Sequence, residues 1–521
     1  MKVATRRLAV VTVLALGLTT AATTAESPSP AAASSTPAAS FAPPAVVTPE
    51  ELGRADFRLV FGSCSKHDRP QPLWGSIRGM KADAFLWLGD AVYADVKMHK
   101  GRHVFLGHEY LVDAYKTQLS NPEYKALTSE TRVLGVWDDH DFGMNNAGAE
   151  WSEKSATKDA YLNFLGEPMS SPRRKREGLF ESYTYRGLGE NKDRSVRVVL
   201  LDTRYAMSVD EGVLLGEEQW AWLEALLAPE WEAAAGSGSE ERTWSKRKRR
   251  KKLTEGYDEN RDNDPVDLTI IGSSIQVHSD LERIIGGIFK GMESWGQFPG
   301  EKERLMDLVA RGGNRAIFLS GDVHHSDIGT SPAGCELPYE LVEVTSSGMT
   351  HGVLDEIRHP TLRALAEYVV PDVIPGWLWP PVGRLQRPKL IAFGFAEVAV
   401  DFEDNSDGSE VGSLTGSVRL HVRNAEGKVK LRKTVRLADL SKTWVEVSGN
   451  ATTGGLSRDR DECKTETNLT RWQKFRMPML CVYCFVVQPV LMIAGLGRLY
   501  HVALSKLLAI RTEQKEGKKD D

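Results

Sequence analysis

Four short apolar runs in this chain each end in side chains that can bind a metal ion. The clearest is AFLWL, residues 84–88, which leads through Gly89 to an aspartate and a tyrosine. Apolar runs of this length indicate buried strands, and in α/β folds ligands gather at the carboxyl ends of strands. The pattern therefore predicts an α/β fold with one shared site. The side chains that follow the four runs are Cys64, Asp90 with Tyr93, Asp139 with His140, and Asp322 with His324.

Several of these residues also have an ordinary structural explanation. Asp90 can cap a helix with Tyr93 packed beneath it. His140 can be a hydrogen-bonded interior imidazole, and Cys64 can be a small core residue. One strand that ends in such groups is common, but four are not, because acidic groups and imidazoles are costly to bury unpaired. We expect other candidates to lie outside the ligand set: Asp141 as a helix cap, His325 in a peripheral role, and His67, His278, His351 and His359 as structural histidines.

The chemistry of the donors indicates what the cluster would do. A carboxylate from Asp90 and a phenolate from Tyr93 are hard oxygen ligands that suit ferric iron. Asp90 is also the best candidate to bridge two cations. Two cations can clamp a phosphate, lower the pKa of a water and stabilise the attacking and leaving oxygens. His140 would then protonate the leaving group or hold a phosphate oxygen.

The other segments of the central region predict further elements of the same fold. Residues 103–127 are expected to be helical, and LGEEQWAWLEALL, residues 215–227, has helical spacing. Strands are expected over residues 195–205, 267–278 and 341–351. After Pro388, the β-like segments FAEVAVDF, VGSLTGSVRLHVRN and KVKLRKTVRL are expected to form a sheet edge that closes the domain.

The N-terminal end predicts secretion. Residues 1–25 combine basic residues, an apolar run and small residues, which is the composition of a cleaved signal peptide. Residues 26–49 are rich in Pro, Ala and Ser and predict a disordered linker. The main domain is expected over residues 50–446. Within it, residues 232–265 form a charged insertion containing KRKRRKK, expected to be a solvated, disordered loop.

The C-terminal end predicts one membrane-spanning helix. Residues 477–497 carry no charge and are long enough to cross a bilayer, although a buried core helix is the alternative. Residues 447–476 form the expected lumenal stalk, with glycosylation sequons at Asn450 and Asn468. Residues 498–521 form a basic cytosolic tail, and the terminal KKDD resembles a dilysine retrieval signal that coat proteins recognise. Together these features predict a type I protein of the endoplasmic-reticulum membrane.

Composition argues against a nucleic-acid-binding protein and against a disulfide-rich fold. A net charge of −5 over 521 residues gives no nucleic-acid footprint, so no nucleic-acid-binding domain is expected. Five scattered cysteines are too few for a disulfide framework.

Seven motifs together resemble one enzyme family. FGSCSK, WLGDAVYAD, WDDHDFGMNNAG, LLDTRY, IGSSIQ, LSGDVHHSD and EVTSSGMTH occur in the order typical of the PhoD-like branch of the metallophosphatases, alkaline phosphatase D. The resemblance covers residues 57–440. It implies a four-layer α/β/β/α sandwich that hydrolyses phosphate monoesters and phosphodiesters.

The resemblance also implies specific ligands. In this family a Cys, an Asp and a Tyr hold iron, matched here by Cys64, Asp90 and Tyr93, and calcium ions complete the bacterial site. Asp139 stands where wider metallophosphatases place an Asn ligand. The remaining correspondences concern the second, divalent cation and the phosphate. Asp322 and His324 fall on a GHxH motif, with Asp in place of its first His, and Gln276 stands where another His is expected. Asn145 is a candidate for a further ligand or phosphate contact.

Three functions remain open at this point. The first is hydrolysis of a phosphate ester by a metal-activated water, with His140 and Asp90 as the catalytic residues. The second is a catalytically silent lumenal binding protein on the same fold. The third is an iron-dependent oxidoreductase that uses a tyrosinate–ferric site.

Overall fold

A computed structural model describes residues 55–97, 103–228, 265–279, 293–356, 387–403 and 414–441, together with residues 53, 363 and 372–374. All of them belong to one compact unit, residues 44–521. Several sequence predictions lie outside the described residues: the signal peptide, the linker, nearly all of the insertion, the stalk with Asn450 and Asn468, the 477–497 helix and the tail. Within the described part, every helix is too short or too polar to cross a membrane.

The first sheet has six strands in the order β16-β15-β14-β1-β2-β5. Strands β1, β2 and β5 run parallel, from the centre of the sheet to one edge. Their sequences are apolar because both faces of these strands are covered. The antiparallel strands β14, β15 and β16 form the other edge, which confirms the predicted sheet edge. The strands span Phe57–Gly62 (β1), Ala84–Leu88 (β2), Arg132–Val136 (β5), Gly394–Glu403 (β14), Thr415–Asn424 (β15) and Val429–Arg436 (β16).

The second sheet has eight strands in the order β12-β13-β10-β11-β9-β8-β7-β6. Strands β7, β8, β9 and β11 run parallel at its centre, so their carboxyl ends share one edge. The strands span Glu181–Leu188 (β6), Arg194–Leu201 (β7), Leu268–Ser273 (β8), Ala316–Ser320 (β9), Ser326–Ser331 (β10), Leu341–Thr345 (β11), Val373–Ile374 (β12) and Lys389–Leu390 (β13).

The inner faces of the two sheets pack against each other. A Cβ placed on Gly272 of β8 would lie 2.9 Å from Leu88 Cδ2 of β2, so the glycine allows the close approach. Near the other end, the rings of Phe57 in β1 and Tyr185 in β6 are 4.6 Å apart. Leu88 and Phe57 are fully buried, and both belong to one continuous core.

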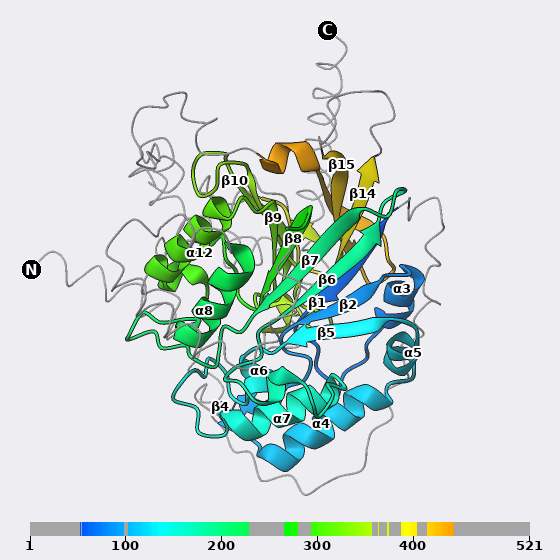
Figure 1. Cartoon of the computed structure of the whole chain (residues 1–521). Coiled ribbons are helices and arrows are strands. Elements are labelled where there is room, and N and C mark those ends of the chain that lie inside the picture. The colour runs from blue at the N-terminus through cyan, green and yellow to red at the C-terminus, as the bar shows by residue number, and fades with distance from the viewer. Residues whose placement is uncertain are drawn as a thin grey trace, which may run out of the picture. The chain divides into compact units, whose positions relative to one another are not determined.

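Helices cover the outer faces of both sheets (Figure 1). Beside the six-stranded sheet, Trp74 of α3 packs on Phe85 and Trp87 of β2 at ring distances of 5.4 and 5.5 Å. Beside the eight-stranded sheet, Arg197 of β7 donates to the carbonyl of Leu226 in α8 at 3.4 Å. The expected mixed α/β class is confirmed. The helices span Trp74–Gly79 (α3), His108–Ser120 (α4), Pro122–Glu130 (α5), Lys154–Phe164 (α7), Gly216–Leu227 (α8) and Pro299–Arg311 (α12).

The helix predicted over residues 103–127 is wrong in two respects. Its first residues form strand β4 (His103–Phe105), which pairs with β3 (Asp95–Lys97). The remainder is split into α4 and α5, because Asn121 leaves the helical region at ψ 121° and Pro122 follows it. The Asn121 carboxamide oxygen accepts from the amides of Glu123 and Tyr124, so it caps α5, and Pro122 occupies the first helical position.

Candidate metal centre

The loops that follow strands of both sheets meet at one place. Cys64 follows β1 and Asp90 follows β2, and the Cys64 thiol lies 3.4 Å from the Asp90 carboxylate oxygen Oδ2. The loop after β11 of the other sheet joins them, since Ser63 Oγ donates to the carbonyl of Ser346 at 3.1 Å. The Cys64 sulfur also lies 3.5 Å from the carbonyl oxygen of Asp322, which follows β9. These strand ends from the two sheets therefore lie at one place, as the sequence predicts.

Four of the predicted ligands stand in a strained backbone conformation. Their φ angles are positive: 59° at Cys64, 53° at Asp90, 68° at Asp322 and 55° at His324. Non-glycine residues adopt this region at a cost, and such outliers cluster at functional sites. In the part of the chain that the structure describes, only three other non-glycine residues have positive φ, so the strain is concentrated at this centre.

The two oxygens of Asp90 face two different groups of donors. Oδ2 lies 3.4 Å from the Cys64 sulfur and accepts a 3.1 Å hydrogen bond from the Tyr93 hydroxyl. Oδ1 accepts from the backbone amide of His140 at 3.3 Å, and the same amide donates to Asp139 Oδ1 at 2.9 Å. Asp90 therefore has the orientation that a bridging carboxylate requires, with one oxygen toward each group.

Asp90, Asp139 and His140 form a compact set of donors. They are buried, and each offers a ligand atom within 4.8 Å of the others. His140 Nδ1 is hydrogen-bonded to the Asp95 carboxylate, and its ring lies 4.1 Å from the Tyr93 ring. Because Asp95 engages Nδ1, Nε2 is the imidazole nitrogen that remains for a ligand or a substrate.

The electrostatics of the centre favour a cation. Burial raises the pKa of the Asp90 carboxyl well above its usual range, and the charge of Asp139 adds to the effect. Burial and the Asp90 charge likewise raise the pKa of the Cys64 thiol and of the Tyr93 phenol. These donors oppose one another's ionisation, and a bound cation would reverse that effect. The donor set therefore fits a bound metal ion.

His140 shows the opposite shift. Burial alone would lower its pKa, but the negative charges of Asp139 and Asp90 and the hydrogen bond to Asp95 raise it to about 10. Without a bound cation the imidazole is thus held protonated among these carboxylates, a form that can contact a phosphate or donate a proton.

The remaining predicted residues are placed less directly. His324 Nε2 lies 3.5 Å from the Tyr93 hydroxyl. The pKa of the Asp322 carboxyl is raised by burial and then by the charges of Asp138 and Asp139, so it belongs to the same electrostatic cluster. Asn145 donates its side-chain amide to Asn146 Oδ1 and its backbone amide to Asp95 at 3.1 Å, and its predicted contact with metal or phosphate stays a prediction.

His351 was expected to be structural, but the structure places it in this centre. Its Nε2 lies 3.0 Å from the Tyr93 hydroxyl and 3.2 Å from His324 Nε2, and the residue is 2% exposed. Its motif, EVTSSGMTH, again joins an apolar strand to a loop that carries a potential ligand. This repeated pattern of strand and loop is the sequence signal that points to His351.

A buried arginine supports the cluster from the second sheet. Arg204, just beyond β7, donates to the Asp138 carboxylate next to Asp139 and makes a 2.6 Å ion pair with Glu293. Ser274, after β8, donates to the same Asp138 oxygen at 2.9 Å. The residue types alone did not identify this network, because its members are far apart in the chain.

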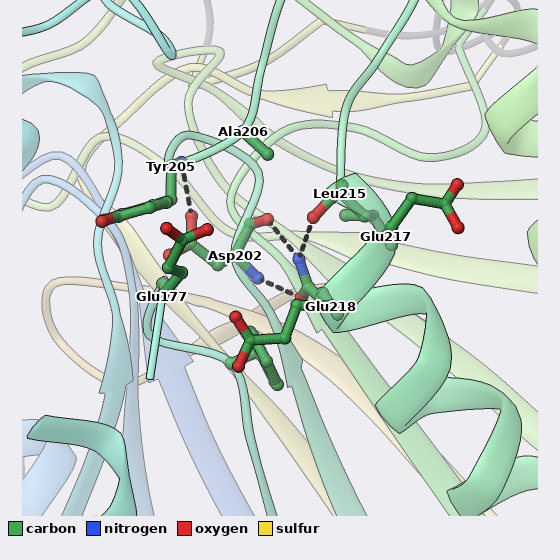
Figure 2. Close-up of a pocket in the computed structure, with 11 residues that line it drawn as sticks. Glu177, Asp202, Tyr205, Ala206, Leu215, Glu217 and Glu218 are labelled. Atoms are coloured by element: carbon green, nitrogen blue, oxygen red, sulfur yellow. Dashed lines mark hydrogen bonds between the residues drawn. The ribbon is translucent and has the colours of Figure 1, made fainter. Parts of the chain in front are cut away.

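A small pocket lies beside the same end of β7 but contains none of the predicted site residues (Figure 2). Its wall is held by Asp202, which accepts from the amides of Arg204 and Tyr205 at 2.9 and 3.0 Å. Glu177, Glu217 and Glu218 also line it. An acidic wall repels a phosphate ester, so this pocket does not suit the substrate predicted from the motifs.

Comparisons with known proteins identify the family. No curated protein sequence matches the chain. A solved structure of PhoD is similar at 15% identity, with a TM-score of 0.45, over 81% of this chain and 77% of that one. A solved structure of GAP50, the anchor in the inner membrane complex of Plasmodium, is similar at 9% identity and a TM-score of 0.38, over 73% and 88%. The sequence profile of the PhoD-like phosphatases matches residues 59–364, which is more than half of the chain. This chain therefore belongs to the PhoD-like phosphatase family, and it is a metallophosphoesterase.

Proposed function

We propose that this metallophosphoesterase hydrolyses phosphate monoesters, phosphodiesters or both at a centre that holds ferric iron and a second divalent cation, Ca²⁺. The orientation of Asp90 carries the proposal. Its carboxylate reaches the Cys64 and Tyr93 donors with one oxygen and lies beside Asp139 with the other. A single carboxylate so placed can serve two cations.

The two groups of donors favour different ions. Cys64 and Tyr93, with one oxygen of Asp90, provide a thiolate and a phenolate, which suit iron in its ferric state. Asp139 and Asp322 provide carboxylate oxygens, which suit a hard divalent ion such as Ca²⁺. Gln276 stands where wider metallophosphatases would place an imidazole, and its side-chain amide donates to Thr345 Oγ1 at 3.0 Å.

The protein groups have separate tasks in the proposed reaction. Cations held by these donors would supply positive charge for the phosphate and lower the pKa of a water. Asp95 holds the His140 ring through Nδ1, which directs Nε2 away from that carboxylate. The His140 imidazolium then binds a phosphate oxygen or protonates the leaving oxygen. The hydrogen bond to Asp95 favours the protonated form of the ring.

Hydrolysis of p-nitrophenyl phosphate and of its bis ester by the purified full chain tests the proposal. Metal content is measured in parallel, before and after chelation. We expect metal-dependent turnover, with Asp90→Asn lowering kcat at least about 100-fold because the shared ligand is lost. Asp210→Asn, at an exposed position, is the matched control and should keep full activity. Turnover that survives chelation, or an unchanged Asp90→Asn enzyme, would contradict the proposal. The ratio of the hydrolysis rates of the monoester and the bis ester shows which class of phosphate ester the enzyme prefers.

We also propose that the enzyme is a type I protein of the endoplasmic-reticulum membrane with a lumenal catalytic domain. The apolar segment 477–497, the two sequons and the KKDD end support this orientation. Cys335 is disulfide-bonded, and disulfides persist in oxidising compartments. A glycosidase should shift the mobility of the protein, and Asn450→Gln with Asn468→Gln should abolish that shift. Protease digestion of intact microsomes should remove only the tail; loss of the catalytic domain would refute lumenal orientation.

A further inference from the structure

His351 occupies a position that its expected structural role does not explain. Its Nε2 faces two other potential metal donors, the Tyr93 hydroxyl at 3.0 Å and His324 Nε2 at 3.2 Å. The third side of this triangle, from Tyr93 to His324, measures 3.5 Å. Three Lewis-basic atoms are thus directed at one another in a site where each residue is largely shielded from solvent.

The size of the triangle matches a shared cation. Ligands at about 2.1 Å from one ion are separated from their neighbours by roughly 3.0 Å in an octahedron and 3.4 Å in a tetrahedron. The three sides, 3.0, 3.2 and 3.5 Å, bracket those values closely. A fourth donor continues the set, because Asp90 Oδ2 lies 3.1 Å from the Tyr93 hydroxyl.

The loop that carries His351 is fastened to the ligand-bearing loops on both sides. Ser347 Oγ donates to the Cys64 sulfur at 3.1 Å and accepts from the backbone amide of His324 at 2.8 Å. Thr350 Oγ1 accepts from the backbone amide of Lys66 at 2.7 Å. The loop between β11 and His351 is therefore held in register with the predicted metal ligands rather than packed as a surface turn.

Gly348 makes the approach to His324 possible. It has a φ of 86°, and a Cβ on it would lie 2.8 Å from the carbonyl oxygen of His351 and 3.3 Å from that of His324. A side chain at this position would push the two histidine-bearing segments apart. The backbone of TSSGMTH is thus shaped to bring the two imidazoles together.

We propose that His351 is a metal ligand, and that with His324 it forms the imidazole side of the cation site that Tyr93 and Asp90 share. The inference rests on the metal centre of the proposed function and adds a residue to it. Imidazole is a ligand for iron as well as for other transition metals, so the assignment fits the ion proposed on the Tyr93 side. The competing explanation is that His351 only hydrogen-bonds the Tyr93 phenol.

Substitution by glutamine separates the two explanations. His351→Gln keeps a side chain that can hydrogen-bond Tyr93 but is a poor metal ligand. The full-length protein is stripped with a chelator and titrated with Co²⁺ alone, followed by its visible absorption and by bound metal per chain. We expect the variant to bind one Co²⁺ at least about tenfold more weakly, with altered absorption bands. The control, His67→Gln, changes a histidine whose ring packs on Tyr110 at 6.0 Å and should bind Co²⁺ like the unmodified chain.

A second variant makes the result independent of folding defects. His351→Ala removes the imidazole, and free imidazole added to it should restore Co²⁺ affinity and absorption. If His351→Gln binds Co²⁺ with unchanged affinity and spectrum, the inference is overturned while the proposed function stands. If the unmodified chain binds no metal at all, the proposed function itself fails. Weakened binding in His351→Gln that imidazole restores in His351→Ala supports the ligand assignment.

Discussion

Asp95 governs how His140 can act, although it is not itself a predicted ligand. Its Oδ1 engages His140 Nδ1, while its Oδ2 lies 2.7 Å from His103 Nδ1 and accepts from the amide of Asn145 at 3.1 Å. The carboxylate is fully buried at the side chain, so it has little freedom to move. It fixes which nitrogen of His140 faces the reaction, and it helps to stabilise the imidazolium.

We predict that Asp95→Asn lowers kcat by about 10²- to 10⁴-fold, because an amide can select the wrong tautomer of His140 and removes its negative partner. KM and metal content should change little, since the Asp95 oxygens contact His140, His103 and the Asn145 amide rather than Cys64, Asp90 or Tyr93. Steady-state kinetics with metal analysis checks this. Asp193→Asn, at an exposed turn, is the control. A variant with normal kcat would show that His140 needs no orientation by Asp95.

Single residues were predictable where a strand run directly precedes them. Asp90 and Asp139 follow apolar runs within three residues, so strand geometry alone places them at the sheet edge. His351 follows β11 only after the loop SSGMT, and its direction depends on how that loop folds. Arg204 meets Asp138 and Glu293 only through the packing of the two sheets, which spacing along the chain does not encode.

At the scale of elements, the turn after β2 is the tightest junction of the centre. Gly89 has a φ of 86°, and a Cβ on it would lie 2.3 Å from Asp138 Cβ and 2.9 Å from Asp138 N. The end of β2 therefore touches the end of β5, which brings Asp90 beside Asp139. A glycine is required here for both its conformation and its small size.

Gly89→Ala should therefore destabilise the protein by about 1–3 kcal/mol more than Gly166→Ala does. Gly166 also has positive φ, at 69°, but nothing lies within 4 Å of the position of its Cβ. Both variants place an alanine at a positive φ, so the difference between their free energies of unfolding reports the steric crowding at Gly89. Denaturant unfolding of the two proteins measures the difference. Equal losses of stability would mean that β5 can retreat from β2 without cost.

Element types were largely predictable because their signals are local. The apolar runs at β2, β7 and β9 and the spacing of α8 contain enough information on their own. The break at Asn121–Pro122 also has a local signal, because a proline disfavours the helical conformation at the residue before it. Strand order and the pairing of β14 with β1 depend on partners more than 300 residues apart, so local pattern does not fix them.

At the scale of the whole described unit, the metal centre joins the two sheets. Cys64, Asp90 and Asp139 follow strands of the six-stranded sheet, whereas His324 and His351 follow strands of the eight-stranded one. Burial, and after it the charges of neighbouring carboxylates, raises the pKa of Asp90 and of Asp322, so these donors are costly to ionise when no cation is bound. A cation bound between these donors would therefore also stabilise the contact between the two sheets.

Chelation should consequently lower the melting temperature of the full chain by several degrees. Loss of a ligand held at 100–1,000 times its Kd corresponds to about 3–4 kcal/mol. Differential scanning calorimetry before and after chelation measures the shift, and adding metal back should restore it. Asp90→Asn, which lacks the shared ligand, should show a much smaller response. An unchanged melting temperature in the unmodified chain would mean that the sheets are held together without the cations.

The span of the centre along the chain also affects how the enzyme is made. Tyr93 and His351 are 258 residues apart, so a ribosome adding about 5–20 residues per second needs roughly 15–50 s to produce the second after the first. Until then the Cys64 thiol and Asp90 lack their partners from the eight-stranded sheet. The proposed donor set is thus complete only late in synthesis, and a cation that needs all of these donors would bind after both sheets have formed.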